Sequence, residues 1–90
     1  MIPQELPLED RLIQLAEEAS ELSQASCKLL RALHGQTPVT EAEAKAHLLE
    51  EIADVFVSIF ALDPDLVAVE AIARKKSKRW EERLNEGRPD

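Results

Sequence analysis

The leucine spacing between residues 8 and 33 is the feature that most constrains how this chain can fold. Small and apolar residues recur there at alternating intervals of four and three, which puts them on one face of a long α-helix. The series consists of Leu8, Leu12, Leu15, Ala19, Leu22, Ser26, Leu29 and Leu33. We therefore predict a helix over residues 8–33, with this face packed on a neighbour.

A turn and a second helix are predicted after this segment. Gly35 stands where a helix would end, and Pro38 follows soon after. Thr40 followed by Glu43 has the form of a capping box, in which each residue hydrogen-bonds the other's backbone at a helix start. We expect the second helix to cover residues 40–62 and to run antiparallel to the first, because the link is short.

A third helix is predicted over residues 64–84. Asp63 can cap its first turn, and Pro64 suits the first helical position. The composition needs no strand, since there is no Tyr, Gly occurs only twice, and Ala, Leu, Glu, Lys and Arg dominate. The predicted fold is a single all-α domain over residues 1–90, an antiparallel helical bundle of about three to four helices.

The second helix has more apolar surface than one neighbour requires. Its apolar residues spread over more than a third of the helix circumference, which is wider than the stripe that packs on a single helix. They are Leu48, Leu49, Ile52, Val55, Phe56, Ile59 and Phe60. A chain of 90 residues also has a small core of its own. We therefore expect another copy to cover this surface, in a homodimer or homotetramer.

The charge balance argues against two classes of partner. The chain has 11 Lys and Arg against 18 Asp and Glu, a net charge of -7, which is unsuited to a general nucleic-acid or anionic-membrane binder. No apolar run approaches the roughly 18 to 20 residues that cross a bilayer, and the N-terminus lacks the pattern of a signal peptide. Cys27 is the sole cysteine, so a reducing compartment is the default. We expect a soluble, cytoplasmic protein.

Two acidic motifs carry the strongest functional signal. The first predicted helix contains EEASE, with Glu18 and Glu21, and the second contains EEIAD, with Glu51 and Asp54. Residues three apart project about 60° from one another and lie one turn apart, so each pair forms a two-pronged oxygen ligand. Asp54 stands in an apolar run, where an ionised carboxylate is costly unless it is paired, hydrogen-bonded or bound to a metal.

The two acidic pairs are expected at the same height in the bundle. The first pair lies 12 and 15 residues before Leu33, and the second lies 11 and 14 residues after Thr40. At a rise of about 1.5 Å per residue, all four are on the order of 16 to 22 Å from the turn. Four carboxylates this close repel one another unless a divalent cation joins them. Oxygen-only ligands favour Mg²⁺, with Mn²⁺ as an alternative.

These motifs resemble those of the MazG-like all-α nucleotide pyrophosphohydrolases, whose mark is E-E-x-x-E on one helix and E-x-x-D on the next. Here Glu17-Glu18-x-x-Glu21 and Glu51-x-x-Asp54 match them. The resemblance implies Mg²⁺-dependent hydrolysis of a nucleoside triphosphate to the monophosphate and pyrophosphate, in an obligate oligomer. It also implies that Glu18, Glu21, Glu51 and Asp54 are the metal ligands. Glu17 would support the site by orienting the attacking water or a further cation.

A basic cluster, RKKSKRW, occupies residues 74–80. Relatives of this kind commonly carry a Lys, then an Arg three residues later, then an aromatic residue, which matches Lys76, Arg79 and Trp80. The resemblance implies that Lys76 and Arg79 contact the triphosphate. One alternative is a solvated helix face on which Trp80 packs. Another is a local acid-base contact of the cluster with the first or the second helix.

Three functional hypotheses remain open. The first is a nucleoside triphosphate pyrophosphohydrolase acting on NTP or dNTP, with clearance of unwanted nucleotides as one role. The second is phosphoribosyl-ATP pyrophosphohydrolase, which ranks lower because LIQLAEEASE lacks the basic residue expected ahead of the acidic pair. The third is a non-enzymatic helical oligomerisation or regulatory module, because a chain rich in charges contains acidic pairs by chance.

Overall fold

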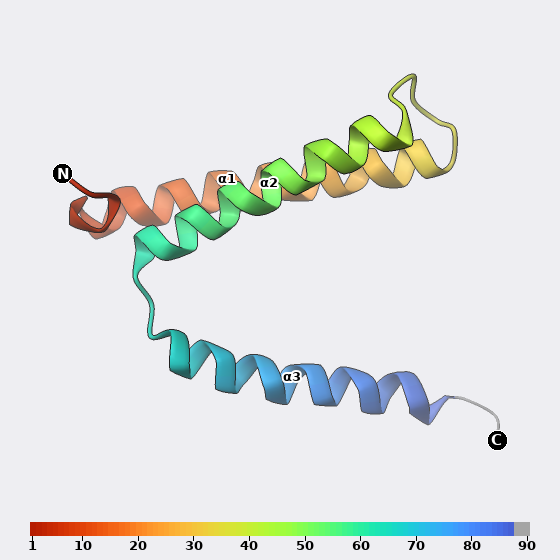
Figure 1. Ribbon diagram of the computed structural model, residues 1–90. Helices are drawn as coiled ribbons and strands as arrows, with labels where there is room; N and C mark the ends of the chain where they lie inside the picture. Colours follow the sequence, from red (N-terminus) through yellow and green to blue (C-terminus); the bar gives the residue numbers. More distant parts are fainter. Residues whose placement is uncertain (88–90) are drawn as a thin grey trace.

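The computed structural model describes residues 1–87 and consists of helices joined by short links (Figure 1). The elements in chain order are a 3-10 turn η1 (Pro3–Glu5), α1 (Leu8–Leu33), α2 (Glu41–Leu62) and α3 (Leu66–Glu86). No strand occurs within residues 1–87. The predicted all-α class is therefore confirmed, while the last three residues of the predicted 1–90 domain lie outside the described residues.

The turn between α1 and α2 follows the sequence signals. Gly35 adopts a left-handed conformation (φ 66°), which glycine accepts without steric cost, and its N–H donates to the carbonyl oxygen of Ala32 at 3.2 Å. The Thr40 hydroxyl oxygen accepts a hydrogen bond from the Glu43 N–H at 3.1 Å. The predicted end of the first helix and the Thr40 cap are thus confirmed. Thr40 itself precedes the helix, which begins at the next residue.

The link between α2 and α3 differs from the prediction. Asp63 ends α2 rather than starting α3, because it adopts the left-handed conformation (φ 56°), which Asp tolerates better than most residues. The N-cap of α3 is Asp65, whose Oδ1 accepts from the Ala68 N–H at 3.1 Å. The prediction that Asp63 and Pro64 begin the third helix was therefore wrong. Carboxylates flank the proline on both sides, and the pattern alone did not distinguish them.

Small side chains fill the interface between α1 and α2. The buried positions of the described chain are Ala25, Ala44, Glu51, Ser58 and Ala61. No large side chain is completely enclosed. The half-buried aliphatic residues around this seam are Leu15, Leu22, Leu29, Leu48, Ile52, Val55, Ile59 and Leu62. Alanine and serine let the two helices approach closely, so the chain has a thin core that runs along one seam.

Residues near the N-terminus of the chain hydrogen-bond the C-terminal end of α2. The Arg11 Nη1 donates to the carbonyl oxygens of Leu62 at 3.0 Å and Ala61 at 3.4 Å. The Gln4 Nε2 donates to the Phe60 carbonyl oxygen at 3.2 Å. The last carbonyls of a helix have no partner inside the helix. These hydrogen bonds supply partners for such carbonyls. The Gln4 bond holds η1, and the Arg11 bonds hold the first turn of α1, against the end of α2.

α3 extends from this hairpin as a separate arm. It makes no substantial interface with α1 or α2, and none of its residues is buried (Figure 1). The predicted bundle is therefore not formed within one chain, because only α1 and α2 pack on each other. The link spans three residues, 63–65, and the left-handed residue at its start turns α3 back along the hairpin without a substantial interface.

Candidate metal centre

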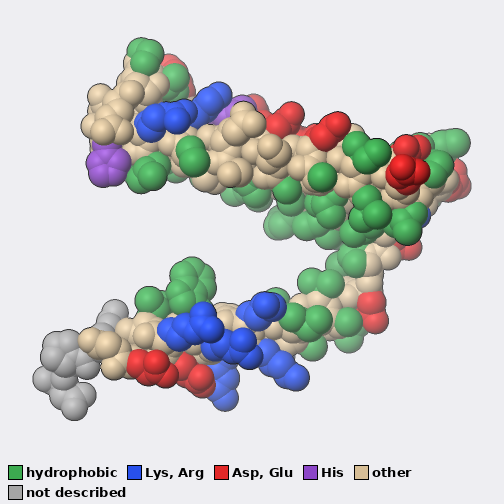
Figure 2. All heavy atoms as spheres, turned by 180° about the vertical axis from the view of Figure 1, so that it is seen from behind, with side chains coloured by type: hydrophobic (Ala, Val, Ile, Leu, Met, Phe, Trp, Pro, Cys, Tyr) green, Lys and Arg blue, Asp and Glu red, His purple; other side chains and the backbone are tan. Residues whose placement is uncertain are grey.

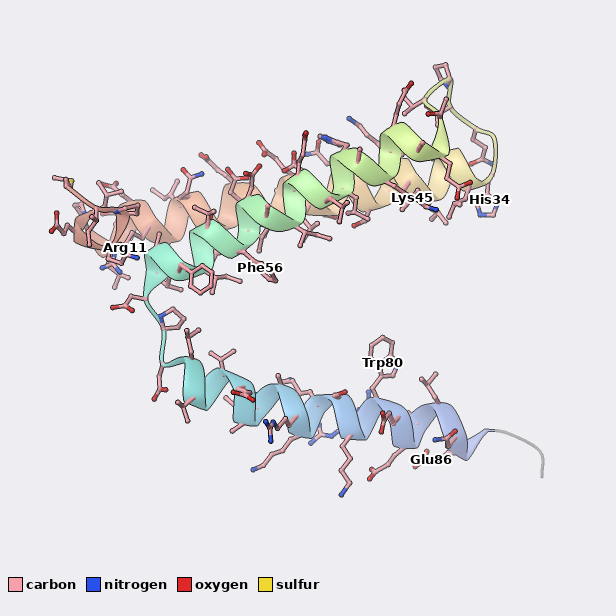
Figure 3. All side chains as sticks on the ribbon, in the orientation of Figure 1. Arg11, His34, Lys45, Phe56, Trp80 and Glu86 are labelled. Atoms are coloured by element: carbon pink, nitrogen blue, oxygen red, sulfur yellow. The ribbon has the colours of Figure 1, made fainter. Side chains whose placement is uncertain are left out.

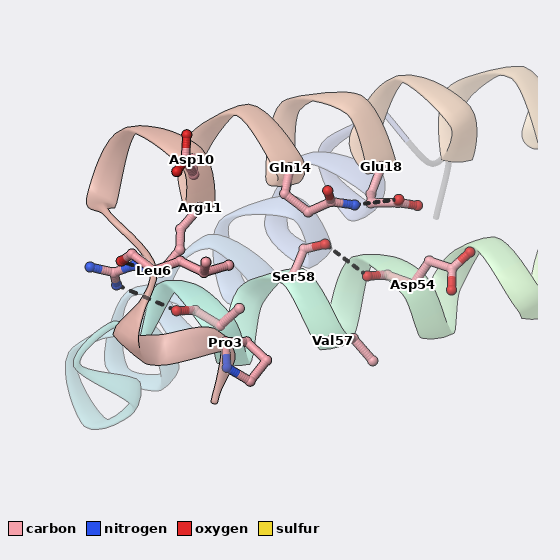
Figure 4. Close-up of a pocket in the computed structure, with 10 residues that line it drawn as sticks. Pro3, Leu6, Asp10, Arg11, Gln14, Glu18, Asp54, Val57 and Ser58 are labelled. Carbon is pink, nitrogen blue, oxygen red and sulfur yellow. Dashed lines mark hydrogen bonds between the residues drawn. The ribbon is translucent and has the colours of Figure 1, made fainter. Parts of the chain in front are cut away.

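Three of the four predicted metal ligands meet in the seam between α1 and α2. Glu18 comes from α1, and Glu51 and Asp54 come from α2; one carboxylate oxygen of each lies within 4.8 Å of the other two. Such an arrangement can hold a metal ion. Figure 4 shows Glu18 and Asp54 extending from the two facing helices. The predicted match in height is confirmed for these three residues.

The buried member of this acidic triad is Glu51, not Asp54. Glu51 is 8% exposed, Glu18 is half-buried and Asp54 is exposed. Asp54 projects about 60° from Glu51 around α2, which turns it toward the rim of the seam. The expectation that Asp54 is the carboxylate in an apolar environment was therefore wrong, because the buried carboxylate is Glu51.

The triad presents carboxylate oxygens that have no hydrogen-bond partner. Glu18 Oε2 and Glu51 Oε2 are both buried and unpaired. Glu18 Oε1 accepts a hydrogen bond from Gln14 Nε2 at 2.7 Å, and Glu51 Oε1 lies 3.7 Å from His47 Nε2. Buried polar atoms in native proteins are nearly always paired, and an ion is one of the partners that explains an exception. The free oxygens therefore fit a cation.

The electrostatics of the cluster point the same way. Burial raises the pKa of Glu18, and the neighbouring charges of Glu21, Asp54 and Glu51 raise it further. The pKa of Glu51 is also raised, first by burial and then by Glu21 and Asp54, while His47 acts in the opposite direction. Each ionised carboxylate nearby therefore disfavours the ionised form of Glu18 and of Glu51. A bound cation would reverse this effect by attracting all of them.

The other two predicted acidic residues of α1 lie outside the triad. Glu21 is exposed, but its charge is close enough to Glu18 and Glu51 to raise the pKa of both. Glu17 is exposed and shares with Glu21 a shallow depression on the outer side of α1. The single chain therefore does not bring Glu17 into the triad, whereas Glu21 stands at its edge.

Lys76 and Arg79 lie on the separate arm. Both are exposed residues of α3, which has no substantial interface with the helices that carry the triad. In this arrangement of a single chain, Lys76 and Arg79 therefore do not contact a triphosphate bound at the triad.

A cavity of about 360 Å³ adjoins the triad (Figure 4). It begins at Glu18 and Asp54 and extends along the seam to η1. Its other lining residues are Pro3, Leu6, Asp10, Arg11, Gln14, Val57, Ser58 and Ala61. Its walls are mainly apolar, with polar groups from α1 between the two ends.

Sequence reasoning missed two of these polar residues. Gln14 stands four residues before Glu18, and this spacing brings side chains together on a helix, so the contact could have been found. Arg11 reaches Ala61 and Leu62, which are about fifty residues away in the chain. No local pattern contains that pairing.

Comparisons of the chain with family models, with curated proteins and with solved structures give no match. The MazG-like resemblance therefore rests on the acidic motifs themselves. Within residues 1–87, no helix combines the length and the hydropathy needed to cross a membrane.

Proposed function

We propose that this chain is a Mg²⁺-dependent nucleoside triphosphate pyrophosphohydrolase that converts NTP or dNTP to NMP or dNMP and pyrophosphate in the cytoplasm. The observation that carries the proposal is the triad of Glu18, Glu51 and Asp54, which gathers carboxylates from two facing helices beside a cavity. The MazG-like spacing of the same residues supports this reaction class.

The carboxylates have distinct roles in this proposal. Glu18, Glu51 and Asp54 bind the cation directly, and Glu21 completes the set from the edge of the triad. All of these ligands are oxygens, which favours Mg²⁺, with Mn²⁺ as a substitute. The cation supplies positive charge that offsets the charge of the phosphates during cleavage. Glu17 orients the attacking water or a further cation.

The cavity supplies room for the rest of the substrate. With the phosphates at Glu18 and Asp54, the nucleoside lies along the seam toward η1, where the walls are mainly apolar. Lys76 and Arg79 contact the triphosphate from an α3 arm, which a homodimer or homotetramer can bring to the triad of another copy. Arginine and lysine pair well with phosphate oxygens.

Pyrophosphate release tests this proposal. The common ribo- and deoxyribonucleoside triphosphates and dUTP are offered to the wild type, to Glu51→Gln and to Glu50→Gln, with Mg²⁺ or Mn²⁺. We expect Glu51→Gln to lose activity by about 100-fold or more, since changes even in residues that only support metal ligands cost 10- to 100-fold. Glu50 is the matched control, because it is adjacent in sequence and its side chain is 78% exposed.

Three outcomes would contradict the proposal. If folded wild type releases no pyrophosphate from the panel but cleaves phosphoribosyl-ATP, the second hypothesis replaces the first. If neither substrate is cleaved and the protein binds no cation, the chain is a helical module whose acidic residues are surface features. Equal activity in wild type and Glu51→Gln would assign the reaction to another site.

A further inference from the structure

Gln14 makes a direct contact with one carboxylate of the triad. Its Nε2 donates a hydrogen bond to Glu18 Oε1 at 2.7 Å (Figure 4). The two residues lie four apart on α1, a spacing that places side chains on the same face of a helix. An ionised carboxylate only accepts hydrogen bonds, so the amide nitrogen of Gln14 faces it. Gln14 also lines the cavity, and it therefore lies where the triad and the cavity meet.

The hydrogen bond distinguishes the two oxygens of Glu18. Oε1 accepts from Gln14, whereas Oε2 is buried and has no hydrogen-bond partner. The terminal torsion of a glutamate is broad and roughly two-fold, so a carboxylate without such a bond can turn and exchange its oxygens. With Oε1 bound to Gln14, Oε2 stays in the seam, where Oε2 of Glu51 is also buried and unpaired. The bond therefore keeps a free oxygen of α1 available to a cation.

Glu18 depends on such a bond more than Glu51 does. Glu51 is 8% exposed, so the packing of α1 on α2 restricts its side chain. His47 Nε2 lies 3.7 Å from Glu51 Oε1, which is beyond hydrogen-bonding distance. Glu18 is only half-buried and has room to change its rotamer. The orientation of Glu51 therefore follows from burial, whereas that of Glu18 follows from Gln14.

The donor to Glu18 is an uncharged amide. Within residues 1–87, no Lys or Arg forms an ion pair with a triad carboxylate. Arg11 lies near one end of the hairpin and Lys45 near the other (Figure 3). Six of the eleven Lys and Arg gather on α3 (Figure 2). A Lys or Arg at the triad would compete with a cation for the carboxylates, whereas an amide orients Glu18 and leaves its charge intact.

We propose that Gln14 is a positioning residue of the metal centre, whose amide holds the carboxylate of Glu18 with Oε2 presented to the cation. Gln14 acts through Glu18 and is not itself a ligand. The inference rests on the metal centre of the proposed function but not on the reaction catalysed there. Side chains that orient metal ligands typically change metal affinity by 10- to 100-fold. Gln14 is exposed, so we expect an effect of about 10-fold, the low end of that range.

Mn²⁺ binding to the full chain tests the role of Gln14. Gln14→Met keeps the length of the side chain but has no N–H donor, and Gln14→Leu is a second variant without a donor. Both should raise the Kd for Mn²⁺ by about 10-fold, measured from the electron paramagnetic resonance of free Mn²⁺. The spectrum of the bound ion should also change, because Glu18 is no longer held in one orientation. Both variants should match wild type in metal-free helicity and Tm, since Gln14 is exposed.

Gln24→Met is the matched control. Gln24 is an exposed residue of the same helix and does not line the cavity beside the triad. This variant should bind Mn²⁺ with the Kd and the bound-ion spectrum of wild type.

Four results would overturn the role of Gln14. Unchanged Mn²⁺ binding and bound-ion spectra in Gln14→Met and Gln14→Leu would remove this role and leave the proposed function standing. Absence of Mn²⁺ binding in folded wild type would remove the metal centre, and the proposed function would fail with it. Equal weakening in Gln24→Met would mean a general effect on α1. A lower metal-free Tm in both Gln14 variants would assign Gln14 to the stability of the fold.

Discussion

α2 and α3 have nearly the same length, 22 and 21 residues, and each carries an apolar stripe, yet their fates in the chain differ. α2 buries Ala44, Glu51, Ser58 and Ala61 against α1, whereas α3 buries nothing. The difference teaches that apolar periodicity shows that a helix needs a partner but does not say where the partner is. For α2, part of the partner is the preceding helix; for α3, the described chain supplies none.

The contrast also concerns charge. Burial and neighbouring carboxylates raise the pKa of Glu18 and of Glu51 in the α1–α2 seam, and each of the two has one unpaired oxygen. The charged residues of α3 are exposed, as in the Arg74 pair with Glu70, where N and O are 2.7 Å apart. Burial makes the charges of the seam destabilising for the folded state. The charges of α3 are solvated, so they change the stability very little. Functional strain is therefore expected in the hairpin only.

Divalent cation should produce the largest difference between the two regions. At a concentration of a hundred times Kd, binding to the folded state alone stabilises it by about 2.7 kcal/mol. For a domain of this size, that free energy raises Tm by roughly 10 to 20 °C. Thermal unfolding at fixed protein concentration measures the shift. Glu51→Gln should show no such shift, and its metal-free Tm should equal or exceed that of metal-free wild type, because one repelling charge is gone.

A similar cation-induced rise in Tm for wild type and Glu51→Gln would contradict this prediction. It would place the bound cation somewhere other than the α1–α2 seam.

Replacing an alanine by leucine should lower the free energy of unfolding in the α1–α2 seam but not on the surface of α3. Ala25 is 0% exposed, so Ala25→Leu should lower the free energy of unfolding by about 1 to 3 kcal/mol, the usual cost of overpacking. Ala71→Leu, on the exposed surface of α3, should change it by no more than about 0.5 kcal/mol. Urea denaturation of both variants gives the values. Equal costs at the two positions would mean that the seam is not the core.

Removing an arginine compares an anchoring contact with a surface pair. Arg11 donates to Leu62 and Ala61 at the end of α2, and Arg11→Ala should cost about 1.5 kcal/mol, as for hydrogen bonds from a charged group. Arg74→Ala loses only an exposed pair with Glu70 and should cost less than about 0.5 kcal/mol. Urea denaturation again measures both. A larger loss of unfolding free energy in Arg74→Ala than in Arg11→Ala would contradict the view that the Arg11 contacts stabilise the fold more than the surface pair of α3.

The pH dependence of metal-free protein should show the smallest effect. The pKa of Glu18 and Glu51 is raised above 4.5 in the folded state, so the folded state binds these protons more tightly than the unfolded state does. Their destabilising effect is present at neutral pH and is relieved as pH falls through the raised pKa toward 4.5. Urea denaturation at several pH values should show this gain in wild type and less of it in Glu51→Gln. Parallel profiles would contradict the assignment of the shift to the seam.

Local rules predicted much of the fold. The leucine spacing predicted α1 with its observed ends, Gly35 predicted its stop, and Thr40 predicted the cap of α2. The α2–α3 link was predicted wrongly, because Asp63 and Asp65 flank Pro64 symmetrically and only the backbone conformation distinguishes them. Each of these outcomes depends on a few neighbouring residues.

The candidate site was partly predictable for a different reason. Matching heights followed from helix rise, so the meeting of Glu18 with Glu51 and Asp54 was foreseen. Burial depends on helix rotation about the seam, which the sequence does not specify. Glu51 therefore replaced Asp54 as the buried carboxylate, and the cavity beside Gln14 was not foreseen.

Binding of Mn²⁺ to the seam is the most direct test of whether these carboxylates form a metal centre. Titration followed by the electron paramagnetic resonance of free Mn²⁺ should show a bound ion in wild type and in Glu50→Gln, whose side chain is exposed. Glu51→Gln should lose this binding, since it removes the buried ligand of the triad. Absence of binding in folded wild type, or equal weakening in Glu50→Gln and Glu51→Gln, would contradict a metal centre in the seam.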